Sequence, residues 1–227
     1  MQGFDFNSMS VYIFNWKKVT DNVEQLYPLI QSVVPDVTII NSDESYVFPS
    51  EMRTIQLDDS YYYGKQYNVA IKHVSKDKIL CIVVGDVSPD TDFKLAFINT
   101  LISFNSYSAG VHAPNDLDSS YTTRHECVGE QLYRVDNTDC TFWCIHPKIV
   151  NVMRDLDYTI SNFGWGIDCI TIHQCESQGL RTLRDYEVGV KQIRKSTGYS
   201  ADIAMIQLNA LKQKYFESLP ELGKGFR

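Results

Sequence analysis

The feature that most constrains the fold is one apolar run, KILCIVVGD, at residues 78–86. So many consecutive apolar side chains are buried only in a strand covered on both faces, which is typical of the centre of a parallel sheet. Short β-rich runs alternate with amphipathic helical runs on either side of it, and this alternation indicates an α/β protein. We therefore predict a single domain with one continuous, mostly parallel sheet flanked by helices.

The same patterns predict where the individual elements lie. Strands are expected at residues 11–15, 36–41, 52–57, 78–86, 108–112, 131–136, 140–145 and 181–190, and helices at 21–34, 64–74, 91–104, 147–156 and 200–219. Thr20 or Asp21 is expected to start the first helix, with Glu24 placed for a capping box. The polar stretch from residue 113 to residue 126 is predicted to be a loop long enough to carry function.

Composition places the chain among ordinary globular proteins. Of its 227 residues, 44% are hydrophobic and 22% charged, and no apolar run reaches the roughly 18 residues that a membrane span needs. The first residues, MQGFDFNSMS, lack the layout of a signal peptide, so we expect a cytoplasmic protein with no membrane partner. The six cysteines include no C-x-x-C pair, which indicates reduced thiols rather than a zinc site or disulfides. Nothing in the sequence sets the oligomeric state.

Charge is unevenly distributed along the chain. The net charge is −7, yet residues 181–227 hold nine Lys and Arg against five Asp and Glu, a net of +4. Residues 1–180 hold twelve against twenty-three, a net of −11. A polyanion, if one binds, is therefore expected to meet the C-terminal part of the chain.

Polar residues follow three of the predicted strands. Asn15 ends the first strand, Asp43 follows the second and Asp86 follows the central one. Ligands of open α/β sheets bind outside the carboxyl ends of the strands, so these three side chains suit one common ligand. The chain has neither G-x-G-x-x-G after its first strand nor G-x-x-x-x-G-K-[ST], which argues against a dinucleotide-binding Rossmann domain and a P-loop. Taken singly, each residue is also a common turn former.

A second informative stretch is NFGWGIDCI, at residues 162–170. Two glycines flank Trp165, and a single carboxylate, Asp168, follows them. Taken alone, this stretch is typical of a tight turn with a half-buried indole and a helix-capping Asp. The alternative is a site where the glycines allow close approach of a ligand and the indole offers it an aromatic face.

Together, these motifs resemble a known family. Their order, from Asn15 and Asp43 through ILCIVVGD and GWGID to KSTGY, is similar to that of the GT-A nucleotide-sugar glycosyltransferases of the large family-two type. The short stand-alone enzymes of bacteriophages resemble it most, over residues 10–200. The resemblance implies a Rossmann-like GT-A fold. Residues 1–106 would bind the nucleotide sugar, 107–200 would form the acceptor and catalytic half, and 200–227 would form a C-terminal helix and tail.

The resemblance assigns a donor site to the first half of the chain. Asn15 and Asp43 would meet the base and ribose of the nucleotide, beside an apolar wall from Phe14 or Trp16. The family's A-R-N-x-G element is matched only at its asparagine, by Asn68. Tyr67 takes the arginine position, which leaves Lys65 as the nearest cation.

The resemblance also implies a metal site, and here the chain departs from the family. Asp86 matches the first acid of the D-x-D element, but Ser88 stands at the second, and Ile193 stands where a metal-binding histidine is expected. A leaving diphosphate is stabilised by a divalent ion or by fixed cations. We therefore expect Arg194 and Lys195 to contribute this charge, with a weakly held Mn²⁺ or Mg²⁺ on Asp86 as the alternative.

Asp168 matches the family's catalytic position. An inverting transfer needs one general base to take the proton of the attacking acceptor hydroxyl. The resemblance places Asp168 at the start of a helix, whose backbone amides are expected to hold it ionised. Trp165 would stack on a sugar or base, and Asp139 and Trp143 would line the acceptor site, although Trp143 is equally suited to the core.

The resulting prediction is an inverting glycosyltransferase that uses a nucleoside-diphosphate sugar, with a UDP-sugar as the preferred donor. The basic C-terminal end and the resemblance to phage enzymes favour a 5-hydroxymethylpyrimidine of phage DNA as acceptor, a base that would have to be presented outside the duplex. A cell-surface or capsular glycan is the rival acceptor. The departures at Ser88 and Ile193 leave a further alternative, a protein that binds nucleotide sugars without catalysis.

Overall fold

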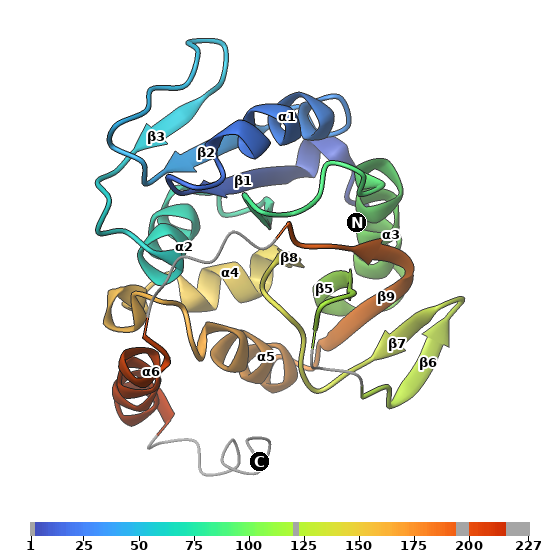
Figure 1. The fold of residues 1–227 in the computed structure, drawn as a ribbon. Helices are drawn as coiled ribbons and strands as arrows, with labels where there is room; N and C mark the ends of the chain where they lie inside the picture. The colour runs from blue at the N-terminus through green and yellow to red at the C-terminus, as the bar shows by residue number, and fades with distance from the viewer. Residues whose placement is uncertain (1–2, 120–122, 194–199, 217–227) are drawn as a thin grey trace.

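The computed structural model describes residues 3–119, 123–193 and 200–216. Within them, nine strands form one sheet in the order β3-β2-β1-β4-β8-β5-β9-β7-β6, and helices lie on both of its faces (Figure 1). The strands are β1 (Met9–Asn15), β2 (Val37–Asn41), β3 (Thr54–Gln56), β4 (Ile79–Val84), β5 (Ala109–Asp116), β6 (Glu126–Gly129), β7 (Leu132–Arg134), β8 (Phe142–Ile145) and β9 (Arg181–Val190).

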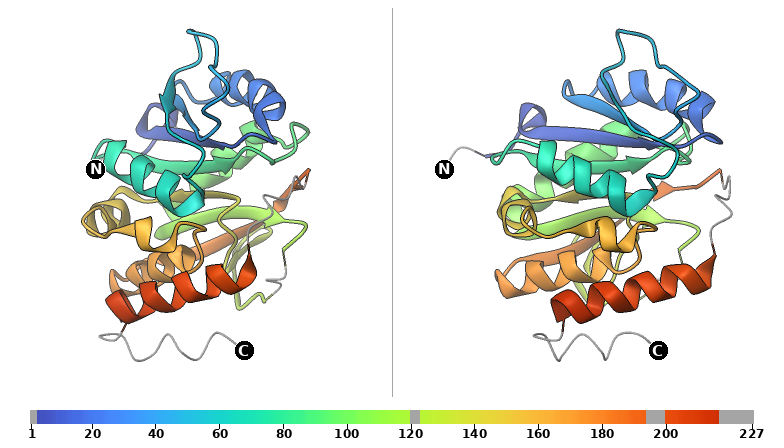
Figure 2. Two further views of the ribbon diagram at one scale, coloured as in Figure 1. Left: turned by 60° about the vertical axis from the view of Figure 1, so that its left-hand side comes forward. Right: turned by 90° about the vertical axis from the view of Figure 1, so that its left-hand side faces the viewer.

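The helices are α1 (Thr20–Gln31), α2 (Tyr63–His73), α3 (Phe93–Ser106), α4 (Pro147–Met153), α5 (Ile167–Ser177) and α6 (Ala201–Phe216), with short 3₁₀ turns η1 (Phe6–Ser8) and η2 (Tyr158–Ser161). Figure 2 shows α2, α4, α5 and α6 stacked along one side of the sheet. None of the helices in the described ranges is both long and apolar enough to cross a membrane.

Strand direction brings the ends of distant strands to one edge of the sheet. β1 pairs in parallel with β2 and β4, and β5 pairs in parallel with β9. β8 lies antiparallel between β4 and β5, so these two strands point the same way. The carboxyl ends of β1, β4, β5 and β9 therefore share one edge, where ligands of α/β sheets bind. The predicted α/β class, with a mostly parallel sheet flanked by helices, is confirmed.

The predicted capping box of the first helix is wrong. α1 follows Val19, and no side chain caps its first turn. Glu24 instead accepts a hydrogen bond from the Tyr46 hydroxyl, and the Thr20 hydroxyl donates to the buried Asp43 carboxylate. Tertiary partners therefore take both side chains that the local pattern assigned to the cap.

The predicted polar loop begins later than expected. β5 continues to Asp116, which pairs with Val190 of β9 across a register shift after Pro114. Pro, Asn and Asp are poor strand formers, so the stretch from residue 114 to 116 carries no local strand signal. Its strand conformation comes from the neighbouring strand.

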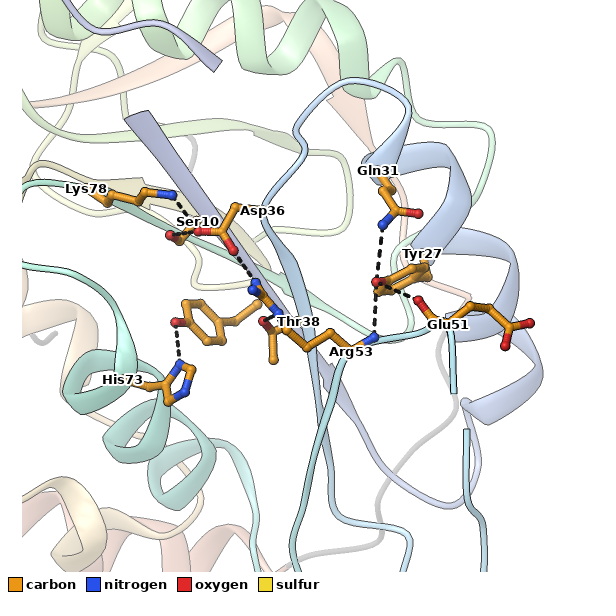
Figure 3. Close-up of polar contacts among 10 residues, drawn as sticks. Ser10, Tyr27, Gln31, Asp36, Thr38, Glu51, Arg53, His73 and Lys78 are labelled. Atoms are coloured by element: carbon orange, nitrogen blue, oxygen red, sulfur yellow. Dashed lines mark hydrogen bonds and ion pairs between the residues drawn. The ribbon is translucent and has the colours of Figure 1, made fainter. Parts of the chain in front are cut away.

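A polar cluster ties together the amino-terminal ends of four strands (Figure 3). Asp36, just before β2, accepts hydrogen bonds from Ser10 of β1 and from Lys78, just before β4. Arg53, just before β3, also donates to it. Burial raises the pKa of the Asp36 carboxyl, but the hydrogen bonds from Lys78, Ser10 and Arg53 lower it by more, so the pKa is about 2.

Asp36→Asn should destabilise the protein most at neutral pH. Since the folded pKa of about 2 lies below the ordinary value of 3.8, the ionised carboxylate contributes stability that is lost as the pH falls through this interval. The side chain is 22% exposed, and we expect a loss of ~2 kcal/mol in the free energy of unfolding at pH 7 and much less at pH 2. Denaturant titrations at both pH values measure it.

The matched control is Asp77→Asn, which removes an exposed carboxylate from the turn just before Lys78. It should change the unfolding free energy little at either pH. An equal loss for Asp36→Asn at pH 7 and pH 2 would contradict the linkage to ionisation.

Candidate functional site

A pocket of about 1200 Å³ opens at the carboxyl edge of the sheet, beside the ends of β1 and β4. Aromatic side chains form much of its wall: Phe14, Trp16, Tyr61, Tyr62, Tyr63, Phe163 and Trp165. The charged residues that line it in the described part of the chain are Asp59, Asp86, Asp118, Asp139 and Asp168, with Lys17 and Lys18 as the cations. The pocket thus offers flat apolar faces to a planar or sugar ring and a mostly acidic surface to the rest of a ligand.

The structure brings part of the predicted site together. Six of the predicted residues line the pocket: Phe14, Trp16, Asp86, Asp139, Trp165 and Asp168. Five others do not line it: Asn15, Asp43, Lys65, Asn68 and Trp143. Arg194 and Lys195 lie outside the described residues.

Asn15 and Asp43 lie beneath the pocket in a buried polar network. The Asn15 amide donates to Asn41 Oδ1 over 2.7 Å, and the Thr20 hydroxyl donates to Asp43 Oδ2 over 3.3 Å. Next to Asp43, Ser42 does line the pocket. The polar residues at these strand ends therefore form a buried hydrogen-bond network beneath the pocket, which we call the floor, and this network positions residues that line the pocket.

Gln66 is the pocket residue that this floor positions most clearly. Its side-chain amide donates to the Asn15 carbonyl over 3.0 Å and to Ser42 Oγ over 2.6 Å. These bonds fix the nitrogen end of the amide, and within the described part of the chain Gln66 Oε1 is buried with no hydrogen-bond partner. A fixed, unpartnered acceptor in a pocket suits an N–H donor of a ligand. No pattern in the sequence singles out Gln66.

The other predicted residues of α2, Lys65 and Asn68, are not part of the pocket lining. The Lys65 ammonium lies 4.9 Å from the centroid of the Tyr61 ring and donates to Ser60 Oγ. Asn68 Oδ1 is buried without a hydrogen-bond partner in the described ranges, and Tyr67 is fully buried. Their contribution to the site is through the packing of α2.

Trp143 belongs to the core under the pocket. It is fully buried, and its indole N–H donates to the Tyr63 hydroxyl over 3.0 Å. The ring also stacks on Tyr67. Trp143 therefore supports an aromatic residue of the wall.

Asp86 follows β4 and is only 8% exposed. Burial raises the pKa of its carboxyl to about 6, and the negative charges of Asp116 and Asp118 add to this effect. Among the residues that the structure describes, Asp86 Oδ1 has no hydrogen-bond partner. The site therefore contains a buried carboxylate oxygen that is left unpaired next to further acids.

Gln192, just after β9, and its neighbour Ile193 connect the ends of β9, β5 and β4 by hydrogen bonds. Its side-chain amide donates to Asp116 Oδ2 over 2.7 Å, and its backbone N–H donates to Asp118 Oδ2 over 3.2 Å. The next residue, Ile193, donates its N–H to the Asp86 carbonyl over 2.7 Å. Sequence reasoning missed Gln192 and Asp118, although Asp116 and Asp118 form a D-x-D pattern inside the stretch expected to be functional.

Asp168 lies in the first turn of α5, after Gly166 as the N-cap residue. Burial raises the pKa of its carboxyl, and hydrogen bonds from the backbone N–H and thiol of Cys169 lower it by less. The net shift is upward, so burial outweighs the effect of the helix amides that were expected to hold Asp168 ionised. Asp139, which also lines the pocket, adds to the rise. Asp168 is thus a stronger proton acceptor than an exposed Asp.

The two glycines around Trp165 have a steric explanation. Gly164 and Gly166 have φ of 89° and 90°, a conformation that L-residues rarely adopt. A Cβ on Gly164 would lie 2.5 Å from Tyr63 Cδ1, and one on Gly166 would lie 2.5 Å from Leu208 Cδ1. The glycines allow this turn to pack against α2 and α6 with Trp165 at the pocket.

The residues present give only a partial metal site. Among the residues that the structure describes, no group of three or more His, Cys, Asp or Glu side chains is placed to hold a metal ion. The unpaired Asp86 Oδ1 nevertheless fits a cation that takes its remaining ligands from a bound substrate.

Comparisons with solved structures support the predicted fold. The structure of GalNAc-T7 with UDP, GalNAc and Mn²⁺ matches with a TM-score of 0.61 and 9% identity, over 92% of this chain and 48% of that one. A197 from STIV matches with a TM-score of 0.50 and 12% identity, over 82% of this chain and 86% of that one. At these identities the likeness shows the fold alone, and the GT-A-like architecture is confirmed.

Comparisons of sequence are less extensive. No known family profile matches the chain. The 2-C-methyl-D-erythritol 2,4-cyclodiphosphate synthase of Leptospira biflexa is 33% identical over an 84-residue alignment, which covers 33% of this chain and 51% of that protein. The chain thus spans about half the length of the curated relatives it matches.

Gly164→Ala should cost more stability than Gly179→Ala. Both glycines have positive φ, 89° and 68°, so alanine strains the backbone at each by ~1 kcal/mol. At Gly164 the new methyl would also meet Tyr63, whereas nothing lies within 4 Å at Gly179. Overpacking adds ~1–3 kcal/mol, measured as the difference in unfolding free energy between the two variants. An equal loss of unfolding free energy in the two variants would show that the close contact with Tyr63 is not the reason for a glycine at residue 164.

Proposed function

We propose that this protein transfers a glycosyl group from a nucleoside-diphosphate sugar to an acceptor hydroxyl, with inversion at the anomeric carbon. The observation that carries the proposal is Asp168, a carboxylate of raised pKa in the first turn of α5, lining an aromatic-walled pocket at the carboxyl edge of a GT-A-like sheet. The fold is shared with a nucleotide-sugar glycosyltransferase. Different residues of the pocket would bind the donor nucleotide and activate the acceptor hydroxyl.

The donor nucleotide would occupy the end of the pocket next to β1 and α2. Phe14, Trp16 and Tyr61 offer aromatic faces on which a base stacks. The fixed Gln66 Oε1 accepts a hydrogen bond from a ring or exocyclic N–H, and the N3–H of uracil fits this requirement. A UDP-sugar is therefore the donor that we propose.

Asp168 would act as the general base. It takes the proton of the acceptor hydroxyl while that oxygen attacks the anomeric carbon, and the bond from this carbon to the diphosphate oxygen breaks on the opposite face. The new bond forms on the face opposite the one that the diphosphate leaves, so the configuration inverts. Trp165, three residues before Asp168, would hold the acceptor ring by stacking, and Asp139 would accept hydrogen bonds from its hydroxyls.

The departing diphosphate needs positive charge. Lys17 and Lys18 line the pocket, and Arg194 and Lys195, predicted for this role from the sequence, follow Ile193 along the chain. A divalent cation bound at Asp86 would supply further neutralisation of the leaving group.

Two acceptors stay in competition. The sequence prediction of a 5-hydroxymethylpyrimidine in phage DNA is supported by the stacking surface of Trp165 and the basic C-terminal residues. A neutral glycan is favoured by the acidic lining of the pocket, because five carboxylates would repel a DNA backbone near the acceptor.

Mass spectrometry of products discriminates between these acceptors. The purified protein is incubated with UDP-sugars and with either hydroxymethylcytosine DNA or a panel of neutral oligosaccharides. A mass increase of one sugar residue on the DNA alone supports the first acceptor, and an increase on an oligosaccharide alone supports the second. UDP binding without transfer or hydrolysis in any mixture would favour the non-catalytic nucleotide-sugar-binding protein.

Asp168→Asn should lower kcat by ~100-fold or more while the dissociation constant of UDP stays near the wild-type value, because the base acts only on the acceptor. In the wild type, kcat/KM should fall as the pH drops through the raised pKa of Asp168, since protonation removes the base. The variant should lose this pH dependence.

Asp155→Asn, which changes an exposed carboxylate near η2, is the control and should keep wild-type kinetics and pH profile. Activity of Asp168→Asn within a few-fold of wild type would show that Asp168 is a structural residue of the helix start.

A further inference from the structure

We propose that Asp86 and Asp118 together hold a divalent cation, Mn²⁺ or Mg²⁺, once a nucleoside diphosphate occupies the pocket. Asp118, just beyond β5, takes the place of the second acid of the D-x-D element, where this chain has Ser88 after β4. The inference rests on the proposed function in one respect, namely that the pocket binds a nucleoside diphosphate.

Asp86 supplies the first observation. The residue is 8% exposed, lines the pocket, and keeps Oδ1 buried without a hydrogen-bond partner among the described residues. A buried carboxylate oxygen without a donor is costly. A cation bound at this oxygen would offset that cost.

Hydrogen bonds place Asp118 beside Asp86. Residues 86–88 pair with residues 191–193, through Ser88 N–H to the Lys191 carbonyl and Ile193 N–H to the Asp86 carbonyl. Between these two bonds, Gln192 donates its backbone N–H to Asp118 Oδ2. The loop after β4 and the loop after β5 are therefore held by the same three residues, and Asp118 faces the same pocket as Asp86.

Ser88 is directed elsewhere. Its hydroxyl accepts a hydrogen bond from the Asp90 backbone N–H, and it is not among the residues that line the pocket. Ser88, which stands at the second acid of the D-x-D element, is therefore uncharged, and its side chain does not line the pocket where a cation would bind.

Electrostatics favours the same arrangement. Gln192 donates to both Asp116 and Asp118, and the next residue, Ile193, donates to the Asp86 carbonyl, so the negative charges of these carboxylates repel one another at this edge. An anionic diphosphate added to this edge would increase the repulsion. A divalent cation between the carboxylates and the diphosphate converts both repulsions into attractions.

The described residues contain no cluster of three or more metal-ligating side chains, and a site with two protein carboxylates does not require one. Mg²⁺, and Mn²⁺ in similar sites, is commonly held by one or two carboxylates together with substrate phosphates and water. The cation site is therefore complete only with the nucleotide in place, and cation binding should depend on the nucleotide.

The test measures Mn²⁺ binding itself, from the electron paramagnetic resonance signal of free Mn²⁺, with and without UDP. Wild-type protein should bind Mn²⁺ tightly only with UDP present. Asp86→Asn and Asp118→Asn should each weaken this binding by ~10-fold or more. Asparagine at residue 118 keeps an oxygen that accepts the Gln192 N–H, so the loop should keep its conformation.

Ser88→Ala and Asp90→Asn are the matched controls in the loop after β4. The first changes the position of the missing acid, and the second removes an exposed carboxylate close to it. Both variants should bind Mn²⁺ like the wild type. Thermal unfolding of every variant checks that the loss of binding is not a loss of fold.

Unchanged Mn²⁺ binding in Asp118→Asn, or equal binding with and without UDP, would overturn the inference. Equilibrium dialysis with radiolabelled nucleotides separates it from the proposed function. UDP that binds equally well in EDTA and in Mn²⁺ refutes the cation site and leaves the glycosyltransferase proposal standing. Failure of UDP, GDP, CDP and dTDP to bind under either condition refutes both.

Discussion

The short antiparallel pairing between residues 86–88 and residues 191–193 holds the pocket together. It joins the loop after β4 to the chain leaving β9, and Gln192 extends the connection to the end of β5. Three strands that are far apart in sequence thereby present their carboxyl ends as one surface. Without it, each acidic loop would be a solvated turn, with no fixed relation between Asp86 and the other carboxylates.

Much of the fold could be predicted from the sequence because its strongest signals are local. The apolar run at residues 78–86 became the buried strand β4, and the strand expected at residues 181–190 has the same bounds in the structure. What no local pattern contains is the order of strands in the sheet. The reversed strand β8 between β4 and β5 is what aligns Asp86 with Asp116, and it follows from tertiary packing alone.

Site residues that belong to one sequence motif could be predicted, whereas residues placed by contacts between distant segments could not. Asp168 and Trp165 come from a single stretch, and both line the pocket. Gln66 faces the pocket because a strand end and Ser42 bind its amide, and a sequence shows neither contact. Asn15 and Asp43 illustrate the reverse case. The sequence predicts that both residues follow strands. Whether their side chains contact a ligand or lie buried beneath the pocket depends on the side chains packed around them.

The placement of the three tryptophans gives the molecule an optical property of its own. Trp16 and Trp165 line the pocket, one beside β1 and one before α5, whereas Trp143 is fully enclosed beneath it. Indole emission responds to contact with a stacked ring and to exclusion of water, so the two pocket indoles change as the pocket fills, while the enclosed one supplies a constant background. Single substitutions of Trp16 or Trp165 by Phe leave one variable fluorophore each, so filling of the pocket beside β1 and beside α5 becomes visible as separate signals.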